Sequence, residues 1–200
     1  RFFGFTEAAI VLGSVLILFG AFVAVQFGYF FGGQANIRLE GFTYAEYARR
    51  GFGELVTTAF FALLLFLGLS MVVQRQTETQ QKIFSGLGVT LTLLVGVMLI
   101  SAFQRLILYE TAYGFTRLRI YTHVSMVWLA FLLVSAAILD IFQRQRLFAL
   151  AALLTSVGFA LSLALLNVDS FILQQNIQRF ERGEPLDVGY LASLSADAVP

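Results

Sequence analysis

The sequence predicts an all-α protein: a polytopic transmembrane helical bundle of five spans, with interfacial amphipathic helices on one side of the membrane. Of its 200 residues, 58% are hydrophobic and only 12% are charged, whereas soluble domains are about 45–50% apolar and about 25% charged. The apolar residues form long blocks of about 20 residues, the length that a helix needs to cross a bilayer. This composition excludes a disordered chain, a coiled coil, a nucleic-acid-binding protein and an ordinary soluble enzyme.

Five blocks have this length, and they cover residues 7–31, 52–73, 83–102, 124–142 and 147–166. Because unpaired backbone groups are too costly in lipid, blocks of this length must be helical. The alternating segments of about 10 residues that build a membrane β-barrel do not occur. We therefore expect residues 1–166 to form the five-span bundle and residues 167–200 to form a juxtamembrane helical segment. Because the chain begins with Arg1 and ends without a tail, we expect it to be part of a longer protein.

Two spans carry small residues at every fourth position. In the third span these are Gly88, Thr92 and Gly96, and in the fifth span they are Ala152, Ser156, Ala160 and Ala164. Small side chains let two helix backbones approach closely. We therefore predict that both faces are helix–helix contacts.

The loops on the two sides of the membrane differ in composition. Side A, formed by residues 32–51, 103–123 and 167–200, carries six of the seven tyrosines and the single histidine, and the seventh, Tyr29, lies at the adjoining end of the first span. Side B, formed by the N-terminus and the short connections 74–82 and 143–146, packs its basic residues into very short loops. Because the positive-inside bias is read best on short loops, we predict that side B is cytoplasmic and side A extracytoplasmic.

The first patterned segment of side A covers residues 43–55. Thr43 and Glu46 form a capping box, which predicts that a helix begins there. Glu46, Arg50 and Glu54 follow at i, i+4 spacing, so that Arg50 can bridge both carboxylates. Glu54 lies inside an apolar block, where a carboxylate is costly unless it is paired. Neutralisation by Arg50 or a neighbouring arginine is the favoured interpretation, and a proton or substrate site is the alternative.

The second patterned segment covers residues 101–123 and brings several polar side chains to one membrane surface. Gly114 is predicted to break the helix and Thr116 to cap the next one. The candidate functional residues are Arg105, Tyr109, Glu110, Arg117, Arg119 and His123. One interpretation is a pocket for an anionic group such as a lipid phosphate, because guanidinium groups suit phosphate. The favoured interpretation is a rim of salt bridges that fixes the helix ends.

The third patterned segment begins at Asn167, directly after the fifth span. Asp169 or Ser170 is predicted to cap a helix, and Asn167 and Asp169 join the candidate functional residues. The helix has one apolar face, formed by Leu173, Ile177 and Phe180, which predicts that it lies on the membrane or on the bundle. A metal site built from Asp169 and Asn176 is a weak possibility because no carboxylate or histidine cluster accompanies them.

Little else in the chain carries a chemical signature. It contains no cysteine and one histidine, and we predict no cofactor and no metal site. Glu54 is the only ionisable residue that lies well inside a predicted span, whereas a proton relay normally needs more. Asp140 and Arg144 are expected to pair at i, i+4.

Four segments resemble a family of bacterial polytopic membrane proteins that is known only as a domain of unknown function. They are YAEYARRGFGEL (44–55), SAFQRLILYETAYGFTRLR (101–119), NVDSFILQQNIQR (167–179) and GEPLDVGYLASLSADAVP (183–200). The resemblance implies a multi-pass protein of the bacterial inner membrane and suggests that family members continue beyond Pro200. It implies no reaction and no catalytic residue.

Three functions are compatible with the sequence. The preferred one is a non-catalytic accessory or scaffold subunit, or an anchor, in a membrane assembly; its partners are membrane lipids and other membrane protein subunits. The alternative is a binder or enzyme for a phosphate-bearing lipid, with the arginines as anion contacts and Glu54 or Glu110 as acid or base. A sensor or transporter is the weakest, because no pair of broken helices or matching half-repeats occurs.

Overall fold

The computed structural model describes residues 4–31 and 52–195, and these residues form helices and short connections without any strand. The all-α prediction is confirmed. The elements in chain order are α1 (Phe5–Phe31), α4 (Phe52–Val72), α5 (Glu78–Tyr113), α6 (Arg117–Ile141), the short 3₁₀ helix η1 (Gln145–Leu147), α7 (Phe148–Leu165), α8 (Val168–Glu181) and α9 (Val188–Ala192). The helix start predicted at Thr43 lies outside the described residues.

Five of these helices, α1, α4, α5, α6 and α7, are long and apolar enough to cross a membrane. The number of spans is therefore as predicted, but three boundaries are not. α5 begins at Glu78 rather than at residue 83 and continues through the polar residues 103–113, and α6 begins at Arg117 rather than at residue 124. The helix continues beyond Ala102 because this segment contains Gln, Arg, Leu and Glu, which are all good helix formers. With 36 residues, α5 is about 54 Å long, well beyond the roughly 30 Å of a bilayer core.

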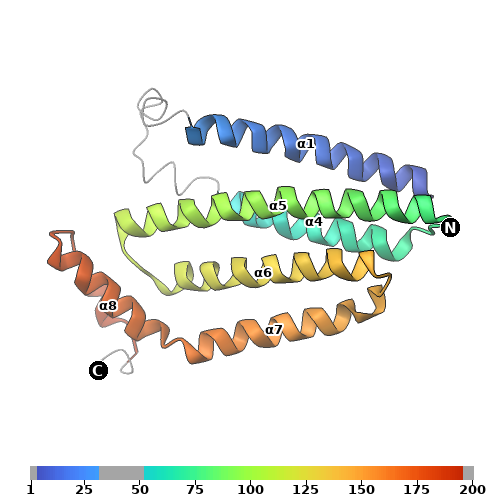
Figure 1. Cartoon of the computed structure of the whole chain (residues 1–200). Helices are drawn as coiled ribbons and strands as arrows, with labels where there is room; N and C mark the ends of the chain where they lie inside the picture. Colours follow the sequence, from blue (N-terminus) through green and yellow to red (C-terminus); the bar gives the residue numbers. More distant parts are fainter. Residues whose placement is uncertain (1–3, 32–51, 196–200) are drawn as a thin grey trace.

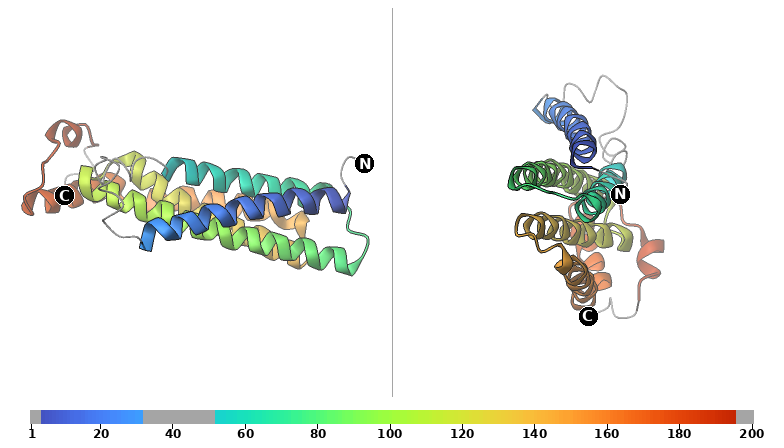
Figure 2. Two further views of the ribbon diagram at one scale, coloured as in Figure 1. Left: turned by 90° about the horizontal axis from the view of Figure 1, so that it is seen from above. Right: turned by 90° about the vertical axis from the view of Figure 1, so that its right-hand side faces the viewer.

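The five long helices run along one another as an extended row rather than a ring (Figure 1). Seen along the helix axes, α1 lies at one edge and α7 at the other, with α4, α5 and α6 between them (Figure 2). α1 packs on α5, α4 packs on α5 and α6, and α7 packs on α6. α8 is inclined to the row and lies at the end where α5 turns into α6, which we call the Gly114 end; the opposite end is the Asp140 end.

The core between α1, α4, α5 and α6 is apolar and is centred on residues such as Leu12, Phe66, Phe84, Leu91 and Leu133. Gly88 of α5 lies against Phe66, because a Cβ atom added to Gly88 would be 2.3 Å from the Phe66 ring. The predicted small-residue contact of the third span is therefore confirmed at this position. At Gly96 the corresponding space is open, so close approach is confined to one part of the face.

The small-residue face predicted for the fifth span is wrong as a contact within the described chain. Ser156, Ala160 and Ala164 are exposed and Ala152 is half-buried, and α7 contributes no buried side chain to the bundle. α7 instead contacts α6 through Gly158, where an added Cβ atom would be 2.1 Å from the Trp128 ring. A large indole needs a residue without a side chain opposite it, and this requirement decides which face of α7 turns inward.

Candidate functional site

The turn between α5 and α6 depends on Gly114. Its backbone has φ +82° and ψ 177°, a conformation that is essentially restricted to glycine, and its N–H donates to the carbonyl oxygen of Glu110 at 2.7 Å. The predicted helix break at Gly114 is confirmed. Thr116 occupies the N-cap position of α6, but its side chain makes no capping hydrogen bond.

Two side chains of α8 bind the backbone of this turn. The side-chain amide of Asn176 accepts from Phe115 N–H at 3.0 Å and donates to the Phe115 carbonyl oxygen at 3.0 Å. Arg179 donates through Nη2 to the carbonyl oxygens of Thr111 at 2.9 Å and Ala112 at 3.3 Å. The last carbonyl groups of a helix have no partner within it. We call Asp169, Asn176 and Arg179, which bind residues 111–117, the α8 clasp.

Asp169 completes the clasp by pairing with Arg117. The Arg117 guanidinium donates through Nε to Oδ1 at 2.6 Å and through Nη2 to Oδ2, a bidentate pair, and Ser195 N–H donates to Oδ2 at 2.9 Å. The hydrogen bonds from Arg117 hold the pKa of Asp169 well below its ordinary range, although burial opposes this effect. Tyr190 Oη accepts from the Arg117 backbone N–H at 2.8 Å and so connects α9 to the same point.

Because Asp169 is bound to Arg117, it does not cap α8, and neither does Ser170. The N-cap is Asn167, whose side-chain oxygen accepts from Ser170 N–H at 3.1 Å. The predicted cap residues are therefore wrong by two or three positions. An asparagine caps as well as an aspartate, and the bidentate contact with a guanidinium is available only to the carboxylate.

The apolar face predicted for α8 is not the face that docks. Ile177 and Phe180 are exposed, whereas Val168, Ile172 and Asn176 are buried together with Asp169 and Arg179. α8 therefore lies on the end of the bundle, one of the two predicted locations, but it does so through a mixed polar face. The backbone groups of residues 111–117 require hydrogen-bond partners, which an aliphatic face does not provide.

Arg119 and Tyr109 lie directly beneath the clasp. The Arg119 guanidinium lies over the Tyr109 ring, 4.2 Å from its centroid, and donates through Nη1 to the Gly114 carbonyl oxygen. Arg119 and Arg117 are therefore both engaged by groups of the same chain. Arg105, the third arginine of the predicted anion pocket, is half-buried one helical turn before Tyr109.

Glu110 and His123 meet between α5 and α6. The Glu110 side chain is 3% exposed and His123 is 15% exposed, and His123 Nδ1 lies 3.2 Å from Glu110 Oε1. The edge of the His123 imidazole packs against Phe103, with ring centroids 4.3 Å apart. Glu110 Oε1 and His123 Nε2 are buried without a hydrogen-bond partner of good geometry.

The remaining predicted residues do not join this cluster. Glu54 lies in the first turn of α4 with its side chain exposed, and its backbone carbonyl accepts from the Thr58 hydroxyl. Glu46 and Arg50 lie outside the described residues, so the structure does not test the expected bridge between them and Glu54.

At the Asp140 end, the predicted pair of Asp140 and Arg144 is wrong. α6 ends at Ile141 and the chain turns away, with Gln143 at φ +56°, so Arg144 is not one helical turn beyond Asp140. The partner is Arg75 of the α4–α5 connection, whose Nη2 lies 2.7 Å from Asp140 Oδ1; both side chains are at most 6% exposed. Ser70 and Ser85 donate to the two Asp140 oxygens at 2.7 Å each.

Three residues that hold these ends together were not recognised from the sequence in this role: Asn176, Arg179 and Arg75. For α8 the sequence does contain a signal. Asn176 and Arg179 lie four and seven residues after the apolar Ile172 and therefore on the same face of the helix, so this face is not purely apolar. For Arg75 the sequence contains no such signal.

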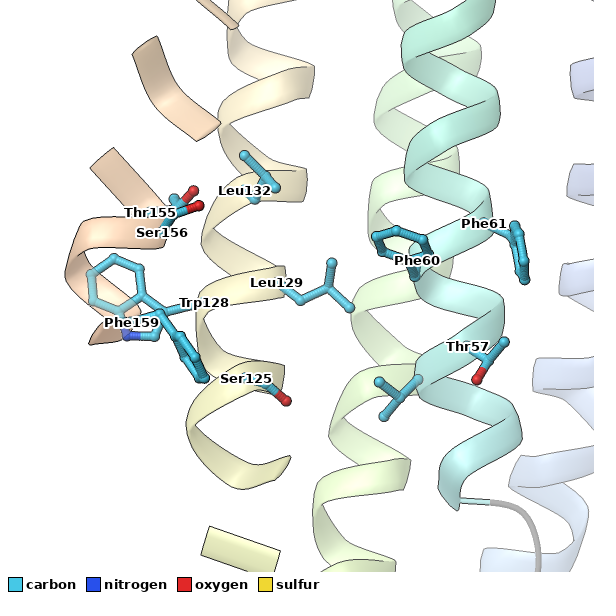
Figure 3. Close-up of a pocket in the computed structure, with 11 residues that line it drawn as sticks. Thr57, Phe60, Phe61, Ser125, Trp128, Leu129, Leu132, Thr155, Ser156 and Phe159 are labelled. Atoms are coloured by element: carbon cyan, nitrogen blue, oxygen red, sulfur yellow. The ribbon is translucent and has the colours of Figure 1, made fainter. Parts of the chain in front are cut away.

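An open apolar groove of about 550 Å³ runs between α4, α6 and α7. Its floor is formed by residues of α6 that include Trp128 and Leu129, and its walls carry Phe60 of α4 and Phe159 of α7 (Figure 3). Ser156 of the exposed small-residue face opens into the same groove. Within residues 4–31 and 52–195, no three His, Asp or Glu side chains are grouped closely enough to hold a metal ion.

Comparison with known proteins gives one match. A family model described as a domain of unknown function, DUF4153, matches residues 1–200. No curated protein and no solved structure matches the chain significantly.

Proposed function

Because this chain belongs to the DUF4153 family, whose function is unknown, we propose a function from its own structure: it is a non-catalytic accessory or scaffold subunit that binds other transmembrane helices. One observation carries the proposal. α7 is long and apolar enough to span the membrane, yet it contributes no buried side chain and has a single long helix, α6, as its main neighbour. A helix at the edge of a row leaves most of its surface for another protein or for lipid.

The kind of surface that α7 exposes favours a protein partner. In a bilayer, lipid tails are as apolar as leucine, so helices associate through close packing of small residues and hydrogen bonds. α7 presents Ser156, Ala160 and Ala164 outward, beside the groove that Phe60 and Phe159 line. The groove and the small residues together form a surface into which a partner helix can pack, and membrane lipids cover the remaining apolar surface.

The alternative, an enzyme or binder for a phosphate-bearing lipid, has less support. Its anion contacts were to be Arg105, Arg117 and Arg119. Arg117 binds the Asp169 carboxylate and Arg119 binds the Gly114 carbonyl oxygen and Tyr109. A phosphate would have to compete with these contacts. The geometry therefore favours the interpretation of this cluster as a device that fixes helix ends.

We further propose that the protein lies in a bacterial inner membrane with the Gly114 end on the extracytoplasmic side. The Asp140 end carries three exposed basic residues: Lys82 near the start of α5, and Arg144 and Arg146 between α6 and α7. Because the chain has no cysteine, single cysteines report the orientation. A membrane-impermeant thiol reagent applied to intact cells should label Gln178→Cys and not Gln143→Cys; the reverse pattern would invert the orientation.

The subunit proposal is tested by native mass spectrometry of the full-length protein, gently extracted from its own membrane. We expect a second protein at fixed stoichiometry. Ala160→Leu should release this protein because it fills the small-residue surface of α7, whereas Ala21→Leu, the same change at an exposed position of α1, should not. A chain that carries only lipid, or equal behaviour of the two variants, would refute the proposal.

A further inference from the structure

We propose that Glu110 and His123 form a proton-binding site that controls how firmly the α8 clasp holds the Gly114 end. This inference does not depend on the proposed function. Glu110 is buried near the end of α5 and His123 is half-buried in the second turn of α6, and the clasp binds the backbone between these helices.

The first step is the charge of the pair. Glu110 is almost fully buried, and among the described residues the only ion-pair partner that it has is His123, at 3.2 Å. A buried carboxylate without a counter-charge is costly. One proton on the pair, either on the carboxyl group or on the imidazole, would leave it without net charge.

The second step is the set of charged and titratable groups around the pair. The charged and titratable residues on the same helix ends are Arg105, Tyr109 and Tyr113 on α5 and Arg117, Arg119 and Tyr121 on α6; Arg179 of α8 is bound to Thr111 and Ala112. α7 has no ionisable residue. The acid of α4 is Glu54, in an exposed first turn, and that of α1 is Glu7, near the opposite end of the bundle. Among the described residues no other carboxylate is paired with His123.

The third step is access to water. Glu110 lies eight residues beyond Ala102, the last residue of the apolar block, which is about 12 Å along the helix axis. On α6, His123 directly precedes the apolar block 124–142 and is 15% exposed, so protons can reach the pair from the Gly114 end. Histidine is the side chain whose charge ordinarily changes near neutral pH.

The last step connects the proton to the clasp. A second proton gives the buried pair a net positive charge, which requires either entry of water or separation of α5 from α6. The carbonyl groups that Arg179 binds belong to the two residues after Glu110. The Gly114 carbonyl is bound by Arg119, one helical turn before His123. Movement of either helix at the pair therefore displaces acceptors of the clasp, and acidification should loosen α8.

The proton site is tested by ¹⁵N NMR of the histidine-labelled full chain in nanodiscs. His123 is the only histidine, so its imidazole signal is assigned directly. We expect Glu110→Gln to move the pH dependence of this signal to lower pH, because a neutral amide does not stabilise an imidazolium. Glu54→Gln, the control at an exposed carboxylate, should leave it unchanged. An imidazole that titrates identically in Glu110→Gln and the parent would overturn the proposal.

The coupling to α8 is tested by electron paramagnetic resonance distances between spin labels at Gln178→Cys on α8 and Leu93→Cys on α5, both exposed positions. Between about pH 8 and about pH 5, we expect the distance distribution to broaden in the parent and to stay unchanged in His123→Gln. Asp169 remains charged in this range because its pKa is held low. No acid response in the parent, or an equal response in His123→Gln, would refute the coupling.

Discussion

Replacement of Gly114 by alanine should open the α8 clasp without disturbing the rest of the bundle. Gly114 has a positive φ and a ψ near 180°, where a residue with a side chain is strained by about 1–3 kcal/mol. The new Cβ atom would also lie 2.5 Å from Asn176 Oδ1 and 2.6 Å from Arg179 Nη1. Both side chains would have to move.

The cost of moving them follows from what they bind. Asn176 holds both backbone groups of Phe115, and Arg179 holds the carbonyl oxygens of Thr111 and Ala112. Each hydrogen bond contributes about 0.5–1.5 kcal/mol. If the rearrangement breaks two of these four hydrogen bonds, their loss and the backbone strain together destabilise the docked α8 of Gly114→Ala by about 2–6 kcal/mol. The population with α8 released should rise by about 30-fold or more.

Limited proteolysis measures this population when the clasp opens and closes faster than the protease cleaves. Trypsin cleavage after the buried Arg179 should accelerate by at least about 30-fold in Gly114→Ala. The control is Gly96→Ala on the same helix, where an added Cβ atom meets no neighbour and replacement of a mid-helix glycine stabilises by about 0.5–1 kcal/mol. Equal cleavage rates in the two variants would refute the reasoning.

Three further predictions concern other contacts. Asp140→Asn should lower the stability in detergent by about 3–5 kcal/mol because it leaves Arg75 buried without its counter-charge; a loss no greater than that of an exposed Asp187→Asn would contradict it. The low pKa of Asp169 stabilises the docked α8 above about pH 3.9, the ordinary aspartate value, and this stability is lost as the pH falls further. Cleavage by pepsin should therefore show that α8 is released as the pH falls below this value. In Asp169→Asn, which has no carboxylate to protonate, this pH dependence should disappear. Gly158→Ala should weaken the packing of α7 on α6 through the Trp128 ring, seen as a lower melting temperature that Gly13→Ala does not reproduce.

The number and location of the spans were predictable from the sequence because the requirement is local. A block of about 20 apolar residues has to be helical in lipid whatever its neighbours are. The ends of α5 and α6 were not predictable in the same way. Residues 103–113 are polar enough to end an apolar block, yet they continue the helix because their backbone hydrogen bonds remain satisfied and α8 supplies partners for the last turn.

The sequence predicted which residues gather at the Gly114 end, but it did not predict which of them contact one another. The convergence of Tyr109, Glu110, Arg119 and His123 at the Gly114 end followed from the helix break and the helical spacing. The choice of partner depends on how each helix is rotated and on which segments return to the same place. Arg75 and Asp140 are 65 residues apart in the chain and pair because the α4–α5 connection folds back onto the end of α6.

The distribution of the polar contacts bears on how a partner would be selected. At the Gly114 end the carboxylate of Asp169, the amide of Asn176 and the guanidinium of Arg179 are used within the chain, and at the Asp140 end Asp140 is used by Arg75 and two serines. A protein that recognises these ends would have to compete with existing bonds. The exposed face of α7 has no such bonds to break, so in the proposed assembly selection there would depend on shape, that is, on whether a partner helix can approach Ala160 closely. The Ala160→Leu variant tests that step directly, because it adds volume while leaving every polar contact of both ends intact.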